Sequence, residues 1–166
     1  VLQTEEHDFN PLNLQNFDIS SLIQEVASSF KRACTKKNLC LYLKTTSISV
    51  FSDQDSLTRI LDNLISNAIK FSHPGKAITI STENSDSKVI IKIKDQGPGF
   101  TENDIKLVFG KFQKLSARPT GGESSTGLGL AIVKVLVENL HGKIKLTSKE
   151  GNGALFTITI PQTITV

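Results

Sequence analysis

The stretch Asp95-Gln-Gly-Pro-Gly99 follows directly after residues 89–94, an apolar run interrupted by lysines. The run predicts a β-strand, and the glycines behind it predict a tight turn whose backbone can approach a flat ring closely. A carboxylate at the strand end, Asp95, can accept a hydrogen bond from an exocyclic amine such as that of adenine. In isolation, however, the pattern favours an ordinary tight turn with a capping aspartate.

A predicted helix upstream, capped by Asp53 and extending to about Ser72, offers a second set of polar groups. It is expected to end before Pro74-Gly75. Asn63, Asn67 and Lys70 are spaced i, i+4 and i+7 in it, so the three side chains share one face. Amide oxygens are suitable ligands for Mg²⁺, and an ammonium group can neutralise phosphate oxygens. Taken alone, the same face is typical of an ordinary solvated helix surface.

A second glycine turn, Gly127-Leu-Gly129, opens an apolar helix that is predicted to run to about Leu140. Exposed N–H groups and the helix dipole at such a start favour a phosphate group. Residues 110–126 lack periodicity and predict a long loop, whose basic side chains, Lys114 among them, could close over a triphosphate. The chain contains neither a Walker A loop nor a Rossmann fingerprint, which disfavours those two nucleotide folds.

The order of the predicted elements indicates the fold class. Helices before, between and after hairpin-connected strands favour a two-layer α/β sandwich, in which a mixed sheet packs on about three helices. Residues 1–17 are polar with little periodicity and are interpreted as a linker, whereas residues 18–166 form one domain. Ser20 or Ser21 is expected to cap the first helix, whose apolar stripe extends to Ala33.

Composition narrows the classes of partner. The net charge of +3 is small and spread along the chain, so nucleic acid is not expected, and no apolar run is long enough to span a bilayer. Cys34 and Cys40 stand near no other metal ligand, so we interpret them as reduced thiols of a cytosolic domain.

In this order and spacing, the motifs resemble the N, G1, F and G2 boxes of the ATP-binding catalytic domain of sensor histidine kinases. This domain belongs to the GHKL superfamily, which also includes DNA gyrase, Hsp90 and MutL. The N box is residues 63–71, the G1 box is Asp95-Gln-Gly-Pro-Gly99, the F box is Phe109-Gly-Lys-Phe112 and the G2 box is residues 125–130. The likeness extends from about Phe17 to Pro161.

The resemblance implies the Bergerat-type ATP-binding fold with a mobile ATP lid, with ATP and Mg²⁺ as cofactors. It assigns Mg²⁺ binding to Asn67 and catalytic roles to Asn63 and Lys70. The nucleotide would be contacted by Asn63, Asn67, Lys70, Phe71, Asp95, Gly97, Gly99, Phe112, Lys114, Thr126, Gly127, Leu128, Gly129 and Leu130. Many members carry glycine where Ser125 stands, and often arginine near Lys114, so this chain departs from the family pattern at two positions of the lid segment.

One position distinguishes classes within the superfamily. ATP-hydrolysing relatives and the related serine kinases usually place glutamate, as a general base, where this chain has Asn63. An amide cannot take a proton at neutral pH, so transfer to histidine, already a nucleophile as neutral imidazole, is favoured over hydrolysis. A regulatory ATPase or serine kinase is therefore a weaker alternative. A degenerate nucleotide-binding or protein-interaction module stays open as another.

The acceptor histidine is expected on a dimerisation and phosphoacceptor domain upstream, with a response regulator as the next, indirect partner. His7 is followed by an acid but has no long amphipathic helices around it, and His73 and His141 stand at predicted helix ends. The isolated domain is expected to be a monomer without membrane contact, although the parent protein could be membrane-anchored.

Overall fold

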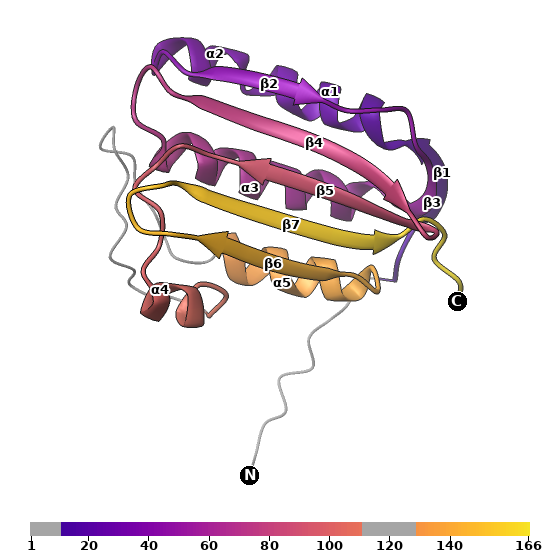
Figure 1. Ribbon diagram of the computed structural model, residues 1–166. Helices are drawn as coiled ribbons and strands as arrows, with labels where there is room; N and C mark the ends of the chain where they lie inside the picture. The colour runs from indigo at the N-terminus through magenta and orange to yellow at the C-terminus, as the bar shows by residue number, and fades with distance from the viewer. Residues whose placement is uncertain (1–10, 111–128) are drawn as a thin grey trace.

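The computed structural model describes residues 11–110 and 129–166, and its main layer is a five-stranded mixed sheet (Figure 1). The strand order is β2-β4-β5-β7-β6, with β2 parallel to β4 and the other neighbours antiparallel. The strands are β2 (Cys40–Lys44), β4 (Ala77–Ser85), β5 (Lys88–Lys94), β6 (Lys143–Ser148) and β7 (Ala154–Pro161). The β4–β5 hairpin expected from the sequence is confirmed, with Asp86 and Ser87 in the turn.

Three helices form the second layer and cover one face of the sheet: α1 (Ile19–Ser29), α3 (Gln54–Phe71) and α5 (Gly129–Asn139). The short helices are α2 (Lys31–Lys36) and α4 (Glu102–Leu107). Burial alternates strictly along β7, because every second side chain points into the layer between sheet and helices. The predicted two-layer α/β sandwich on about three helices is therefore confirmed.

Aspartates begin two of the helices. Asp53 caps α3 as predicted, accepting a hydrogen bond from the Ser56 N–H at 2.9 Å. The cap of α1 was expected at Ser20 or Ser21, which is wrong: Asp18 accepts from the Ser21 N–H at 2.8 Å. Hydrogen bonds from the Ser47 hydroxyl and the Ser21 N–H hold the pKa of Asp18 below its ordinary value. The predicted single helix to Ala33 is also wrong, because α1 ends at Ser29 and α2 begins at Lys31.

A separate two-stranded sheet pairs β1 (Leu14–Asp18) with β3 (Ser49–Asp53) in antiparallel register. Residues 14–17 were expected to be linker, and this boundary is corrected by the pairing. Gln15 and Asn16 are exposed, while Leu14 and Phe17 are half-buried and pack against the core. A strand with only two apolar contacts has too weak an alternation to be recognised among polar residues.

His141 completes the C-terminus of α5 as a structural residue. It adopts a left-handed conformation with φ of 60°, its N–H donates to the Glu138 carbonyl at 3.0 Å, and the Gly142 N–H donates to the Val137 carbonyl at 2.9 Å. These two hydrogen bonds form a Schellman motif, which satisfies the last carbonyls of a helix. The predicted place of His141 at the end of a helix is confirmed.

Candidate functional site

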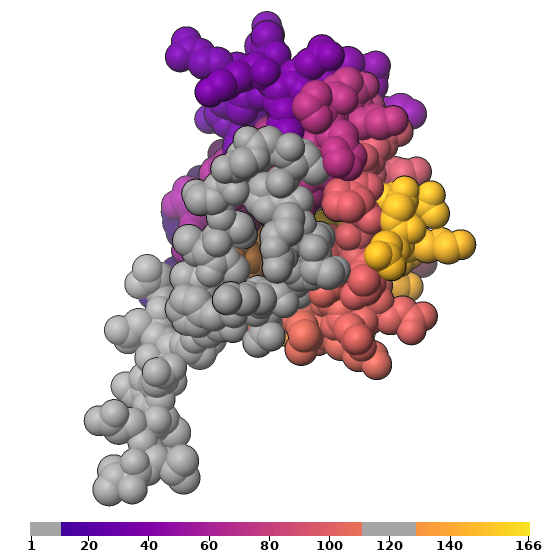
Figure 2. Space-filling view, turned by 90° about the vertical axis from the view of Figure 1, so that its left-hand side faces the viewer, coloured from indigo at the N-terminus to yellow at the C-terminus, as the bar shows by residue number. Residues whose placement is uncertain are grey.

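Segments far apart in the sequence meet at one end of the sandwich. The C-terminus of α3, the turn after β5, the turn between β6 and β7, and the N-terminus of α5 all lie at the left-hand end in Figure 1. Figure 2 faces this end and shows magenta, coral and yellow segments meeting on one surface. The topology thus brings the predicted N box and G1 box together with the start of the G2 helix.

Asp95 lies at the end of β5 and is 4% exposed. Its Oδ1 accepts hydrogen bonds from the Gly97 N–H at 2.9 Å and from the Ala154 N–H at 3.2 Å. Burial raises the pKa of Asp95 above its ordinary value, and these two backbone hydrogen bonds oppose the rise. Within the described part of the chain, no group donates to Oδ2. One carboxylate oxygen is therefore fixed by the backbone, while the other keeps its capacity to accept.

Gly97 joins this turn to the last residue of α3. A Cβ at position 97 would lie 2.3 Å from the Phe71 carbonyl oxygen and 3.2 Å from Asp95 Oδ1. No side chain fits at such a distance, so the glycine is required by close backbone approach rather than by its own dihedral angles. The end of the polar helix and the carboxylate of Asp95 are consequently held in a fixed relation.

The turn between β6 and β7 packs against the same segment, which the sequence did not reveal. The Ser148 hydroxyl donates to the Gly153 carbonyl at 2.6 Å and accepts from the Phe100 N–H at 2.8 Å, while the Gly151 N–H donates to the Pro98 carbonyl at 2.6 Å. A Cβ at Gly153 would lie 2.2 Å from the Asp95 carbonyl oxygen. The signal in the sequence is the pair of closely spaced glycines, Gly151 and Gly153, but no local pattern shows which distant segment they contact.

An aromatic chain supports the turn from below. Phe71 and Phe100 contact edge to face with ring centroids 6.1 Å apart, and Phe100 contacts Phe156 in the same way at 6.4 Å. Phe71 is only 8% exposed. Its described contact is thus with the core beneath the turn, and its expected place against the nucleotide stays a prediction.

The polar face of α3 turns toward the start of α5. Asn63, Asn67 and Lys70 are all half-buried, in agreement with the predicted shared face. Asn63 Nδ2 donates to the Arg59 carbonyl at 2.8 Å, and its Oδ1 lies 3.1 Å from the place that a Cβ on Gly129 would take. Because it has no side chain, Gly129 lets the N-terminus of α5 lie directly beside the Asn63 amide.

Lys37, the C-cap residue of α2, holds the last turn of this helix. Its Nζ donates to the carbonyls of Ile69 at 2.8 Å and of Lys70 at 3.0 Å. A cation at a helix C-terminus interacts favourably with the unpaired carbonyls and with the helix dipole. Lys37 thereby fixes the backbone from which Lys70 projects, a positioning role that no pattern in the sequence indicated.

Several expected residues lie outside the described part of the chain, namely Phe112, Lys114, Thr126, Gly127 and Leu128. Leu130 is half-buried and packs against the core. Phe109, the first residue of the F box, also packs against the core, and the Lys134 ammonium of α5 lies 5.8 Å from its ring centroid. This contact ties the end of the segment after α4 to α5.

The donor atoms near the start of α5 suit Mg²⁺ better than a transition metal. Over residues 11–110 and 129–166, no three His, Cys, Asp or Glu side chains gather as a metal cluster. The amide oxygens of Asn63 and Asn67 are hard ligands, and Mg²⁺ ordinarily takes few protein ligands and completes its shell with phosphate oxygens and water. These residues therefore fit an ion that arrives with a nucleotide.

Most of the chain matches a known protein family. A family model described as Histidine kinase-, DNA gyrase B-, and HSP90-like ATPase matches residues 52–164. Sensor-like histidine kinase SenX3 of Mycolicibacterium smegmatis is 35% identical over 154 residues, which cover 90% of this chain and 39% of that protein. The chain thus spans well under half the length of this relative.

The solved structures that resemble this chain are also histidine kinases. The nucleotide-free catalytic domain of histidine kinase ThkA has a TM-score of 0.81 at 26% identity, over 92% of this chain and 97% of that one. Full-length ShkA in complex with AMPPNP has a TM-score of 0.80 at 27% identity, over 92% of this chain and 32% of that one. ThkA in complex with response regulator protein TrrA has a TM-score of 0.76 at 27% identity, over 90% of this chain and 42% of that one.

The chain therefore belongs to the histidine kinase, DNA gyrase B and HSP90-like ATPase family, as an ATP-binding catalytic domain of the sensor histidine kinase type. Among the described residues, no helix has both the length and the apolar character needed to cross a bilayer.

Proposed function

We propose that this domain binds ATP with Mg²⁺ and supplies the γ-phosphate to a histidine on a separate dimerisation domain of the same protein, in two-component signalling. The observation that supports this most strongly is Asp95, a buried carboxylate with one oxygen held by two backbone N–H groups. This arrangement leaves Oδ2 of Asp95 able to accept a hydrogen bond from an amine, in a glycine turn where a planar ring can lie against the backbone.

Adenine recognition follows from the two oxygens of Asp95. Oδ1 is committed to Gly97 and Ala154, so the carboxylate cannot rotate freely, and Oδ2 is left to accept from the exocyclic amine. A guanine presents a carbonyl oxygen at the corresponding position, which a carboxylate would repel. We therefore expect ATP to be bound in preference to GTP.

The phosphates would lie between the N-terminus of α5 and the polar face of α3. The first N–H groups of α5 attract anions, and Lys70 supplies a full positive charge. Asn67 would bind Mg²⁺, with Asn63 beside it, and Mg²⁺ when bound supplies neutralisation of the β- and γ-phosphate charge. Phe112, Lys114 and the G2 residues 126–128 complete the proposed nucleotide contacts.

Asn63 determines the type of reaction in this proposal. Its amide donates to the Arg59 carbonyl and cannot act as a general base, so this position does not activate water. A neutral imidazole needs no such help, because its unprotonated nitrogen already attacks phosphorus. The domain would thus present the γ-phosphate to a docked histidine in the cytosol, and a response regulator would receive it next, as the solved ThkA–TrrA pair suggests for this class.

Two measurements test the proposal separately. Titration calorimetry of the purified chain with a non-hydrolysable ATP analogue should give one-to-one binding that Mg²⁺ strengthens, and GTP should bind more weakly. Phosphotransfer from radiolabelled ATP should then require the full-length protein with its own dimerisation domain, and the isolated chain should show little labelling. Binding without any transfer in the full-length protein would instead favour the degenerate nucleotide-binding module. Rapid ATP hydrolysis by the isolated chain would favour a regulatory ATPase.

A further inference from the structure

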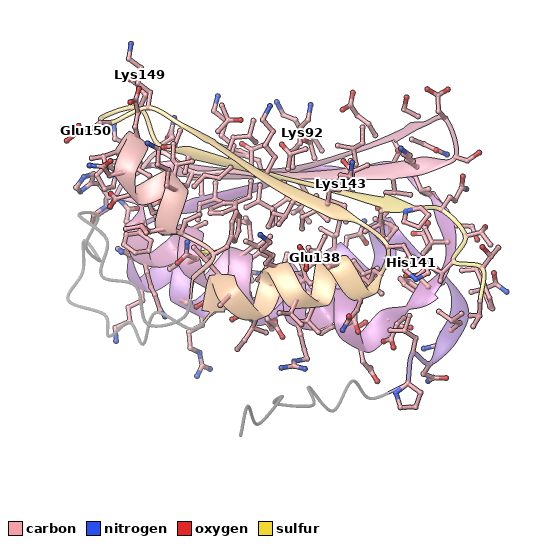
Figure 3. The ribbon with its side chains drawn as sticks, turned by 90° about the horizontal axis from the view of Figure 1, so that it is seen from below. Lys92, Glu138, His141, Lys143, Lys149 and Glu150 are labelled. Atoms are coloured by element: carbon pink, nitrogen blue, oxygen red, sulfur yellow. The ribbon has the colours of Figure 1, made fainter. Side chains whose placement is uncertain are left out.

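The sheet face opposite the helices carries an unusual concentration of lysines. We call the outward-pointing side chains of the five-stranded sheet the open face. Figure 3 shows the sheet from below, with Lys92 on the side away from the helices. Strand alternation and register assign six lysines to this face: Lys44, Lys88, Lys92, Lys94, Lys143 and Lys145.

The register arranges three of these lysines in one row across the strands. Lys44 lies opposite Ser81, Ser81 opposite Lys92, Lys92 opposite Thr157, and Thr157 opposite Lys145. Lysines therefore stand on alternate strands, about 10 Å apart for an interstrand spacing near 5 Å. Short hydroxyl side chains separate them, so the ammonium groups project above a low surface that can itself donate hydrogen bonds.

Acidic side chains hardly offset this charge. Glu83 is the acidic residue that the register places on the open face, and it pairs with Lys92 at 3.1 Å. The face thus holds six of the 19 basic residues and one of the 16 acidic ones, which leaves thirteen basic and fifteen acidic residues elsewhere. Charge that is dispersed along the sequence is therefore gathered by the fold into one strongly basic surface.

Apolar groups lie among the lysines. Ile90 and Leu155 are half-buried on the two central strands of the open face, and Tyr42 is 53% exposed on the edge strand β2. These apolar side chains lie between the lysines, and tyrosine is among the residues enriched at protein–protein interfaces, so the face offers apolar area as well as charge to a folded partner.

Other polyanions suit this face less well. Single-stranded nucleic acid is bound on sheets whose central strands carry aromatic platforms, and here β5 and β7 offer none outward. Neighbouring strands twist by about 20–25° each, so the outer lysines of a five-stranded sheet cannot all reach one flat bilayer. A folded partner can follow the twist, and carboxylates complement the lysine rows directly.

We propose that the open face is a docking surface for a partner protein that presents an acidic surface, with carboxylates around apolar side chains. The face is separate from the nucleotide site, because Asp95 and the polar side of α3 lie in the layer between sheet and helices or at its end. Docking there leaves nucleotide binding possible, so a partner could be held while the domain carries ATP.

The experiment uses the whole chain and three defined probes: a labelled polyglutamate peptide, a duplex DNA oligonucleotide, and vesicles containing phosphatidylserine. Charge reversal of the central row, with Lys44→Glu, Lys92→Glu and Lys145→Glu together, should weaken polyglutamate binding at least about tenfold. In the unchanged chain, polyglutamate should shift backbone NMR signals mainly of β4, β5 and β7. Thermal unfolding should confirm that the variant folds.

The matched control reverses three exposed basic residues of α2, with Lys31→Glu, Arg32→Glu and Lys36→Glu, and should bind polyglutamate nearly as well as the unchanged chain. Equal losses in the two variants would overturn the proposal, because binding would then follow net charge alone. Tighter binding of DNA or vesicles than of polyglutamate, lost in the same row variant, would also overturn it and assign the face to that polyanion.

Discussion

The two ends of the proposed nucleotide site are built in different ways. At the Asp95 end, backbone meets backbone: Cβ atoms at Gly97 and Gly153 would lie 2.3 Å and 2.2 Å from carbonyl oxygens. At the α5 end, the Asn63 side chain is the one described group that a Cβ at Gly129 would meet, at 3.1 Å. The difference indicates that the proposed adenine pocket is preformed by interlocked turns, while the proposed phosphate end is bordered by side chains that can move.

The largest expected effect comes from breaking the interlocked turns at Gly153. Gly153→Ala places a Cβ against the Asp95 carbonyl oxygen and forces an L side chain into a φ of +76°. Overpacking and left-handed strain should together cost roughly 2–5 kcal/mol of the free energy of unfolding. Urea denaturation of the Gly153→Ala variant and of the unchanged protein measures this loss in the free energy of unfolding.

Gly151→Ala is the matched control for that variant. Gly151 has a similar φ of +85°, but no atom of residues 11–110 or 129–166 lies within 4 Å of its Cβ position. Gly151→Ala should therefore lower the free energy of unfolding only by the cost of the left-handed conformation, about 1–2 kcal/mol. Equal losses at the two glycines would mean that close approach to Asp95 contributes nothing, and the preformed pocket would have to be abandoned.

The next largest effect is expected from Asp95→Asn on nucleotide affinity. The Asn oxygen would take the place of Oδ1, where the N–H groups of Gly97 and Ala154 donate, and its NH₂ group would then face the amine of adenine. Two donors cannot pair, so affinity for an ATP analogue should fall by about 1.5–3 kcal/mol. Titration calorimetry measures this affinity. The control is Asp86→Asn in the distant β4–β5 turn, because the φ of 52° at residue 86 suits Asn as well as Asp. Unchanged affinity in Asp95→Asn would exclude adenine recognition by this residue.

The same substitution tests how burial affects the Asp95 end as pH changes. Because burial raises the pKa of Asp95, the folded state favours the protonated carboxyl. The free energy of unfolding should therefore fall as pH rises from the ordinary value of 3.8 through the folded pKa, and this contribution is absent in Asp95→Asn. The stability of the variant relative to the unchanged chain should increase over that window. Parallel pH profiles from urea denaturation would contradict this account of the site.

The sequence predicted the structure correctly where a local pattern of residues is enough to determine it. Asp53 before an amphipathic run predicted the start of α3, and the spacing of Asn63, Asn67 and Lys70 predicted their shared face. It failed where tertiary contacts decide. The packing of Gly153 against Asp95 joins residues that are distant in sequence, and no local pattern shows which glycine serves a turn and which serves close approach. The gathering of lysines on the open face likewise appears only with the strand register.

At the phosphate end, Asn67→Ala should remove most of the affinity that Mg²⁺ adds to ATP binding and leave metal-free binding nearly intact. Asn67 offers one amide oxygen to the ion, and the phosphates hold the rest of its shell. Titrations with and without Mg²⁺ measure the two components, with Ser66→Ala on the same helix as control. A loss of equal size in both conditions would show that Asn67 does not act through the metal.

The smallest effect is expected from Gly129→Ala, because the atom in its way belongs to a side chain. The new Cβ would lie 3.1 Å from Asn63 Oδ1, which can shift by a few tenths of an ångström, while alanine favours the helix more than glycine does. The free energy of unfolding should change by no more than about 0.5 kcal/mol. In an Asn63→Ala background the obstruction is gone, so the same substitution should become stabilising, and a double-mutant cycle measures the coupling. A loss as large as that of Gly153→Ala, independent of residue 63, would mean that the start of α5 is as rigidly packed as the Asp95 turn, and the contrast between the two ends would not hold.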